Sequence, residues 1–537
     1  MQIEWQQTGN AWHDWGLCEL YHILQSAELS GKVDVGTPYM HGFTMTSELP
    51  KEDLVHQITS AIISNDRWNA LHPTFPEGRA IQRCAPRTEN GRRIPGEKYD
   101  DKVTKEEWET HGLKGKPPSA IRNRCQRLIS VTFTASQLAE IFSQNDKNGL
   151  LYKMVEAALT PNSMGDITQG INPLVGKHHS NVTVRGPGGT NGVLAGSSQE
   201  VLASVCASIS AWKPFAKDDS TIILLPVGLS FPLLVKLWQH LRYTALTDPD
   251  SSDGDMYRNI PSRVEGDAAN LLALLNAIQD NLAMRDANLL TMTEVRHLNK
   301  WMAIHLNSGT NIIVGAIHIF EAGANVFDLL EPIEIPSYKR NDGEVIPEKE
   351  ISFMADIFSQ VRVENTTWQE RMAKSILLAG KNPQGAWGAM EDCAFLLSRN
   401  VKNAKTTNRW AAWHLPNCYN KFAERLTTMT TEQIAGCKKI GELTGSVFYN
   451  DITLLSRLHN TTSASDMRAI LELIAFRLFK ASNGTDRKGM WHLSPAEFDI
   501  IFEITHTSEW QAAAQTISAF ASLKEFNINL GEENKSK

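Results

Sequence analysis

The sequence has no uninterrupted hydrophobic run long enough to cross a membrane, and no CxxC pair among its seven cysteines. The most apolar stretch, residues 221–238, is broken by prolines, a glycine and a lysine, which predicts a buried strand, a turn and a helix. An odd number of cysteines without that spacing fits neither a disulfide framework nor a common zinc ribbon. We therefore expect reduced thiols, a cytoplasmic location and no membrane attachment. The N-terminus also lacks the basic region of a secretory signal.

An excess of positive charge is missing as well. The formal net charge is -7, which argues against a protein that coats nucleic acid through its overall charge. No HExxH, GxSxG, P-loop or paired-carboxylate motif is present. Cys18, Cys206 and Cys393 stand in apolar helical stretches, where inert thiols are expected. The absences favour a binding protein over an enzyme, with no catalytic residue, metal or cofactor.

The pattern of elements predicts an α+β fold with a helical C-terminal part. Residues 1–355 mix strand-like runs, such as 311–320, with helical stretches, such as 197–212. Polar stretches at 86–119, 247–260 and 338–350 indicate long surface loops or linkers. Residues 360–528 contain capped amphipathic helices without strands, including a capping box at Thr430 and Gln433 and a long helix over 463–484. We predict an antiparallel helical bundle there, followed by a disordered tail at 529–537.

The stretch TGNAWHDWGLCELYHIL, residues 8–24, predicts a turn followed by a helix. Asp14 suits the N-cap, and the next apolar residues recur at helical spacing. These are Leu17, Leu20, Tyr21 and Leu24. The adjacent pair His13-Asp14 also suggests an alternative, a metal-dependent phosphohydrolase or nuclease that uses these residues with His178 or His179. The sequence lacks the further spaced His and Asp of such a site.

Residues 165–196 form a glycine-rich segment with many basic and amide side chains and hardly any acid. Glycine permits close approach of the backbone to a ligand, and Lys, Arg and Asn contact phosphates and base edges. The spacing of the glycines fits no nucleotide-binding motif. A loop that contacts nucleic acid is the functional interpretation, and a surface loop with incidental polar residues is the alternative. The candidate residues are Gln169, Asn172, Lys177, His179, Asn181, Arg185 and Asn191.

Two local groups of basic residues interrupt the acidic chain. Residues 76–130 hold thirteen Lys and Arg against eight acids, a composition that suits contact with a phosphate backbone or a solvated loop. The candidates there for guide RNA or DNA backbone contact are Arg92, Arg93, Lys114, Lys116, Arg122, Arg124 and Arg127. A second basic surface is predicted on the bundle, at Lys402, Lys405, Arg409, Lys438 and Lys439.

The opening stretch resembles the N-terminal signature of the large subunit of type I CRISPR effector (Cascade) complexes, nearest the subtype I-B and I-A branch. The matching residues are Thr8, Gly9, Asp14, Gly16 and Leu17. The chain length, the mixed N-terminal region, the helical C-terminal region and the lack of catalytic motifs agree with that family in outline.

The resemblance implies a non-catalytic subunit of a ribonucleoprotein complex in antiviral defence. Guide RNA would read the target by base pairing, while this subunit would recognise the protospacer-adjacent motif in duplex DNA and aid strand opening. The implied partners are the guide RNA, target double-stranded DNA, the backbone, handle-capping and small subunits, and the helicase-nuclease. We assign motif recognition to the segment 165–196, because amides and a lysine suit readout of the minor groove. A scaffold without a nucleic-acid role is a further interpretation.

Overall fold

The computed structural model describes most of the chain, with gaps. The described residues are 1–27, 29–64, 88–89, 92–93, 145–147, 149–168, 172, 174, 193–210, 215–217, 220–245, 264–283, 290–308, 312–335, 337–339, 345–346, 348–447, 452–483 and 494–533. The chain divides into two compact units. Unit 1 comprises Met1–Trp238 with His305–Ala316, and unit 2 comprises Gln239–Ile304 with Ile317–Lys537. The predicted bundle, 360–528, lies wholly in unit 2.

Unit 1 begins with a three-stranded antiparallel sheet in the order β1-β3-β2. Its strands are β1 (Gln2–Gln6), β3 (Gly42–Ser47) and β2 (Val33–Val35). Alternate side chains of β1 are buried, as expected of a strand with one face on the core. Trp5 stacks on Phe43 with ring centres 6.1 Å apart. Phe43 also meets Tyr21 of helix α1 (Ala11–Ser26) edge-on at 5.0 Å. The sheet therefore packs on α1 through aromatic side chains.

Helix α1 begins earlier than the sequence predicts. Its N-cap is Asn10, whose side-chain oxygen accepts hydrogen bonds from the backbone N–H groups of Trp12 and His13. The prediction of Asp14 as the N-cap is wrong, because Asn suits the cap equally well and Asn10 comes first along the chain. Asp14 instead lies in the first turn, where a carboxylate interacts favourably with the helix dipole. The predicted apolar face is confirmed as buried: Leu17, Leu20, Tyr21 and Leu24.

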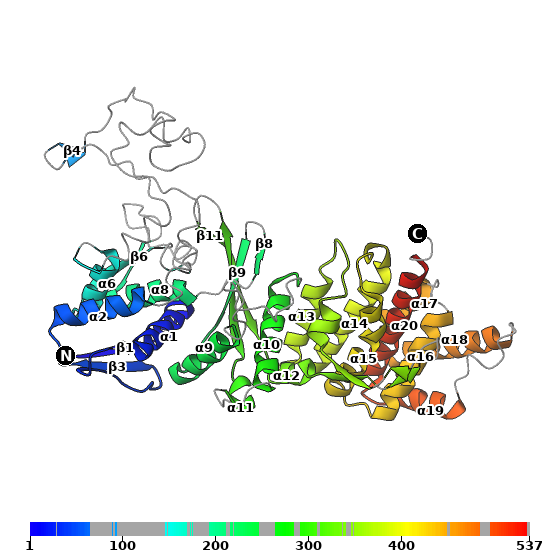
Figure 1. Cartoon of the computed structure of the whole chain (residues 1–537). Helices are drawn as coiled ribbons and strands as arrows, with labels where there is room; N and C mark the ends of the chain where they lie inside the picture. The colour runs from blue at the N-terminus through cyan, green and yellow to red at the C-terminus, as the bar shows by residue number, and fades with distance from the viewer. Residues whose placement is uncertain are drawn as a thin grey trace, which may run out of the picture. The chain divides into compact units, whose positions relative to one another are not determined.

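Helix α8 (Ser198–Ser210) packs closely along α1 (Figure 1). Gly16 of α1 faces the backbone of α8, and a Cβ atom at this position would collide with the carbonyl oxygen of Ala203. Ala203 and Ala207 are themselves fully buried. Small residues on both helices thus allow the two backbones to approach. Trp12 adds a hydrogen bond from Nε1 to the carbonyl oxygen of Ser204, at 2.9 Å.

An antiparallel pair of strands leads directly into α8. Strand β6 (Met164–Thr168) pairs with β7 (Val193–Ser197), from Met164 opposite Ser197 to Thr168 opposite Val193. Ile167 is buried against Val201 of α8, and Met154 of α6 (Leu150–Ala158) packs on both. Helix α2 (Lys51–Ile63) lies next to α6 (Figure 1). The strand pair is therefore held on the helices by its own apolar residues.

A four-stranded sheet has the order β11-β10-β9-β8. Its strands are β11 (Ile312–Glu321), β10 (Lys300–Ser308), β9 (Ser220–Pro226) and β8 (Phe215–Lys217). Strand β9 continues through a turn at Gly228, with φ +76°, into α9 (Phe231–Ala245). The strand, turn and helix predicted over 221–238 are confirmed. The strand predicted at 311–320 is confirmed as β11, and the helix predicted at 197–212 is confirmed as α8 over Ser198–Ser210; residues 211, 212 and 311 lie outside the described residues. A separate two-residue pair joins β4 (Thr88–Glu89) to β5 (Arg92–Arg93).

Unit 2 contains helices α10 (Asp267–Ala283), α11 (Met292–Val295) and α12 (Asn325–Leu330), followed by two short ribbons. Strand β12 (Ile333–Ile335) pairs with β15 (Lys349–Ile351), and β13 (Tyr338–Lys339) pairs with β14 (Val345–Ile346). The prediction of a loop throughout 338–350 is wrong. Buried isoleucines at 333, 335 and 351 attach the outer ribbon to the core, although the stretch between them is charged.

Helices make up the rest of the described chain. The π-helix η2 (Phe353–Phe358) precedes α13, and the short helix η3 (Val401–Asn403) follows α14. The predicted capping box is confirmed: Thr430 N donates to Gln433 Oε1 at 2.8 Å, and Gln433 N donates to Thr430 Oγ1 at 3.2 Å. The helices are α13 (Trp368–Leu378), α14 (Pro383–Arg399), α15 (Arg409–Leu426), α16 (Thr431–Val447), α17 (Ile452–His459), α18 (Ala464–Asn483), α19 (Pro495–Ile504) and α20 (Trp510–Glu533).

Helix α20 packs against α14, α15, α16 and α17, and is the red helix in Figure 1. Gly441 and Gly445 of α16 face its backbone, where a Cβ atom would meet Ile517 and Ala521. The helix extends into the predicted disordered tail, so that prediction is wrong for residues 529–533. Leu530 follows Phe526 by one helical turn and is buried, so the apolar face continues past the predicted end. Residues 534–537 lie outside the described residues.

The predicted fold class is confirmed, with a mixed α and β N-terminal part and a helical C-terminal part. Among the described residues, no helix combines the length and the apolar character needed to span a bilayer.

We predict that Gly16→Ala destabilises unit 1 by about 1–3 kcal/mol, because the added methyl group forces α1 away from α8. Urea unfolding of the full chain, followed by tryptophan fluorescence and circular dichroism, measures the change. Gly31→Ala is the matched control, since a Cβ atom there meets nothing within 4 Å, and it should shift stability by less than about 0.5 kcal/mol. Equal stability of the two variants would contradict the close packing.

Candidate nucleic-acid interface

The turn before α1 is closed by the carboxylate of Asp14. Its Oδ1 accepts a hydrogen bond from the backbone N–H of Thr8 at 2.9 Å, and its Oδ2 accepts one from Gly9 at 3.2 Å. Gly9 has a φ of +81°, a conformation that favours glycine. Thr8, Gly9 and Asp14 of the sequence signature therefore act together as one turn. Gly16 and Leu17 complete the signature by packing α1 on α8 and on the core.

His13 belongs to the same buried cluster. Its Nδ1 lies 3.1 Å from Asp14 Oδ1 and 3.2 Å from Thr8 Oγ1, and only 3% of the residue is exposed. Both carboxylate oxygens of Asp14 already accept backbone hydrogen bonds. Within the described part of the chain, neither residue joins a group of three potential metal ligands. The geometry is that of a closed turn, and it gives the phosphohydrolase alternative no support. His178 and His179 lie outside the described residues.

Asn10 connects this turn to the glycine-rich segment. Its Oδ1 accepts the two helix N–H bonds and a third hydrogen bond from Asn172 Nδ2 at 3.3 Å. The same amide nitrogen lies 3.5 Å from Ser204 Oγ of α8, and Asn172 Oδ1 accepts from the backbone N–H of Leu174 at 3.0 Å. Asn172 thus joins the start of the segment to both helices.

Asn172 was a predicted DNA contact, and the structure corrects this assignment. The residue is 1% exposed, and its amide is engaged in hydrogen bonds within the protein. A buried amide has no surface with which to reach a duplex, so Asn172 anchors the segment. The remaining predicted contacts of this segment lie outside the described residues: Gln169, Lys177, His179, Asn181, Arg185 and Asn191.

The two ends of the segment are nevertheless defined. Residues 169–192 connect the last pair of the β6–β7 ribbon, in which Thr168 lies opposite Val193. The glycine-rich segment 165–196 therefore begins and ends in the two strands of a hairpin, which rest on α6 and α8, and residues 169–192 connect these strands. The sequence analysis did not predict this hairpin. No local pattern in the sequence indicates it, because the two strands are separated by residues 169–192.

A polar cavity of about 300 Å³ lies beside the turn, between β1 and the β7–α8 junction. Thr8, His13 and Ser197 contribute to its wall, together with the carboxylates of Glu4 and Glu200. Glu200 accepts a hydrogen bond from the backbone N–H of Ser197 at 2.7 Å. Two carboxylates and no cation would repel a phosphate, so this cavity is not assigned to nucleic acid.

Helices α1 and α8 each carry one buried thiol. Burial raises the pKa of Cys18 on α1 and of Cys206 on α8, so both remain protonated at neutral pH. Burial also raises the pKa of Cys393 in the bundle, to about 12. A thiol with a raised pKa is a poor nucleophile. The prediction that these three cysteines are inert core residues is supported.

The N-terminal basic candidates are only partly described. Arg92 and Arg93 form β5, where Arg92 lies opposite Glu89 and Arg93 opposite Thr88. The other candidates of this group lie outside the described residues: Lys114, Lys116, Arg122, Arg124 and Arg127.

The basic candidates of the bundle fall on two separate elements. Lys402, Lys405 and Arg409 are exposed on η3, the turn after it and the start of α15. Arg409 donates a hydrogen bond to the carbonyl oxygen of Gly531 at 3.3 Å. Lys438 and Lys439 are half-buried on α16, and the ammonium of Lys438 lies over the Phe520 ring at 5.6 Å. Only the first group presents freely exposed cations.

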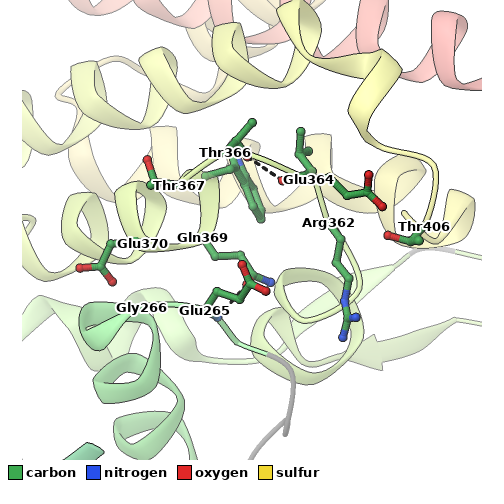
Figure 2. Close-up of a pocket in the computed structure, with 11 residues that line it drawn as sticks. Glu265, Gly266, Arg362, Glu364, Thr366, Thr367, Gln369, Glu370 and Thr406 are labelled. Atoms are coloured by element: carbon green, nitrogen blue, oxygen red, sulfur yellow. Dashed lines mark hydrogen bonds between the residues drawn. The ribbon is translucent and has the colours of Figure 1, made fainter. Parts of the chain in front are cut away.

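A pocket of about 420 Å³ lies in unit 2, where α10 and α13 begin (Figure 2). Figure 2 shows Gln369 and Glu370 of α13 beside Glu265 and Gly266. Glu370 Oε2 accepts hydrogen bonds from the backbone N–H groups that start α10, at 2.9 and 3.4 Å. Gln369 Oε1 accepts from Glu265 N at 3.0 Å. These side chains fasten one helix to the other, and the pocket carries more carboxylates than cations, so it does not suit a phosphate.

Comparison with known proteins finds no family model, no curated protein and no solved structure that matches this chain significantly.

We predict that Asn172→Ala weakens the connection between the segment, α1 and α8 by about 1–3 kcal/mol, because it leaves a buried N–H group of Leu174 without its acceptor. Hydrogen exchange should accelerate in peptides covering residues 8–15 and 172–174, by about tenfold for each 1.4 kcal/mol lost. Gln25→Ala is the control, because Gln25 makes one exposed hydrogen bond, to Val35. Unchanged exchange in both peptides would show that Asn172 is not an anchor.

Proposed function

We propose that this chain is a non-catalytic subunit that recognises a short motif in duplex DNA within an RNA-guided complex of the type I CRISPR effector class. The observation that carries the proposal is the hydrogen bond between Asn10 and Asn172. It joins the turn that resembles the family signature to the base of the glycine-rich segment. The two features that pointed separately to this function belong to one structural unit.

The base of the segment has the rigidity that a recognition element requires. Recognition is precise when the contacting side chains extend from elements that are themselves held by packing and hydrogen bonds. Here the ends of the segment are fixed by the β6–β7 ribbon and by buried Asn172. Between them the sequence supplies glycines, Lys177, Asn181 and further amides. Such side chains suit the acceptors of the minor groove, which display A·T and G·C pairs differently.

The overall charge fits a subunit that works inside a complex. A chain with a net charge of -7 does not bind DNA by general attraction, whereas a local contact next to a guide RNA needs little nonspecific affinity. In the proposed role, base pairing with the guide reads the target, and this chain tests the adjacent motif and favours opening of the duplex. Docking of the helicase-nuclease and contacts with the guide-bearing subunits belong to the same proposal.

We predict that Lys177→Ala combined with Asn181→Ala lowers the affinity of the assembled complex for target duplex by at least about 30-fold, because two base-edge contacts of about 1–3 kcal/mol each sum to about 2 kcal/mol or more. The probe is a guide-matched duplex whose flanking motif has been selected from a randomised library. Equilibrium filter binding measures the affinity, and size-exclusion chromatography measures assembly.

Lys480→Ala combined with Asn299→Ala is the matched control, since both residues are exposed and lie outside the segment. This pair should bind duplex like the wild type, and both pairs should assemble normally. If the Lys177 and Asn181 variant binds as well as the control, the segment does not recognise the motif. If a complex that lacks this chain binds and opens target duplex as well as the complete complex does, the chain has no role in recognition.

A further inference from the structure

A polar cleft of about 800 Å³ opens in the helical bundle, between the adjoining ends of α14, α17 and α20. Glu391 and Asp392 on α14 and His459 at the end of α17 lie in its wall. Their potential ligand atoms all lie within 4.8 Å of one another. Neither the sequence signature nor the proposed recognition segment involves these residues.

His459 is held in one orientation by two contacts. Its Nδ1 lies 2.9 Å from both carboxylate oxygens of Glu391. Its ring stacks on Phe395 with the centres 4.1 Å apart and the planes 2° from parallel. Glu391 is only 3% exposed, and its Oε1 also accepts a hydrogen bond from Ser518 of α20 at 2.5 Å. A histidine whose Nδ1–H is bonded to a buried carboxylate presents Nε2 as the free ring nitrogen.

The Nε2 atom faces a second carboxylate at a distance that suits a shared ion. It lies 3.7 Å from Asp392 Oδ1, which is too long for a hydrogen bond. Two ligand atoms bound to one Zn²⁺ at about 2.0–2.2 Å each lie about 3.3–3.6 Å apart at the tetrahedral angle, and up to about 4.2 Å apart at wider angles. An ion therefore fits between the imidazole and Asp392 with a slight opening of that angle.

Further polar side chains line the cleft. Gln515 Oε1 is buried without a hydrogen-bond partner in the described part of the chain, and Gln515 lines the same cleft. Asn460 and Gln511 also contribute polar groups to the wall. Asp392 is two-thirds exposed, so the cleft is open to solvent, and water can fill the remaining positions.

We infer that this cleft binds one divalent transition-metal ion, with Zn²⁺ the best fit, through His459 Nε2 and the Asp392 carboxylate. Glu391 is a positioning residue that orients the imidazole through Nδ1. Imidazole and carboxylate ligands with open positions suit Zn²⁺ in preference to Mg²⁺, which prefers oxygen ligands alone. The ion would add a further connection between α14 and α17. This inference does not rest on the proposed function.

Zinc titration of the full chain tests the inference. After dialysis against a chelator, calorimetry should show one Zn²⁺ per chain with a Kd in the micromolar range or tighter. Asp392→Asn and His459→Gln should each weaken this site at least tenfold, and Glu391→Gln should weaken it by about 10- to 100-fold. Substitution with Co²⁺ should give visible absorption bands that the Asp392→Asn variant lacks.

The control is His506→Gln, which removes an exposed histidine from the same bundle and should bind Zn²⁺ like the wild type. Asp392 is exposed, so Asp392→Asn keeps the fold, which circular dichroism checks. Absence of stoichiometric Zn²⁺ binding to the folded wild type would overturn the inference and leave His459 as a hydrogen-bond partner of Glu391. Binding that survives Asp392→Asn and His459→Gln unchanged would overturn it as well.

Discussion

The close approach of α1 and α8 is the constraint on which the positions of the N-terminal turn and the β6–β7 ribbon depend. It requires glycine at position 16, because the carbonyl oxygen of Ala203 occupies the space that a Cβ atom would take. Strand β7 runs directly into α8, so the position of α8 also fixes the β6–β7 ribbon. The hydrogen bond between Asn10 and Asn172 adds a second attachment at the base of the segment. Packing of the two helices thereby positions Thr168 and Val193, the last pair of the ribbon.

This arrangement gives a physical reason for each residue of the opening signature. Thr8, Gly9 and Asp14 close a turn, which places Asn10 as the N-cap of α1. Gly16 and Leu17 then seat the helix on α8 and on the core. The pair His13-Asp14, which suggested a metal site, thus belongs to a closed turn. This turn is joined to the β6–β7 hairpin through the hydrogen bond between Asn10 and Asn172. The C-terminal bundle contains a different histidine–carboxylate cluster, formed by Glu391, Asp392 and His459. There Nδ1 of His459 contacts Glu391, and Nε2 faces Asp392.

Local signals in the sequence predicted many elements correctly. The capping box at Thr430 and Gln433, the strand and helix around Gly228, and the apolar face of α1 all depend on residues within a few positions of each other. The errors have equally physical causes. Asn10 and Asp14 are both good N-caps, and propensity alone does not choose between them. The charged ribbon at 338–350 forms because isoleucines on either side of it are buried.

The candidate sites were less accessible to sequence reasoning, because they depend on contacts between distant residues. The pairing of β6 with β7 spans residues 169–192, and no local pattern reports it. Asn172 looked like a nucleic-acid contact by residue type, and only its burial reveals an anchor. Glu391 and His459 are separated by 68 positions, and their hydrogen bond follows from the packing of α14, α17 and α20. Residue type indicated the chemistry, whereas tertiary packing determined which residues remain available for it.

The most direct measurement of the central claim is photocrosslinking within the assembled complex. A guide-matched duplex with a photoreactive base in the flanking motif would be bound and irradiated, and its adducts on this chain mapped by mass spectrometry. The account predicts adducts within residues 169–192. Adducts confined to the exposed bundle residues Lys402, Lys405 and Arg409, or the absence of adducts on this chain, would contradict it.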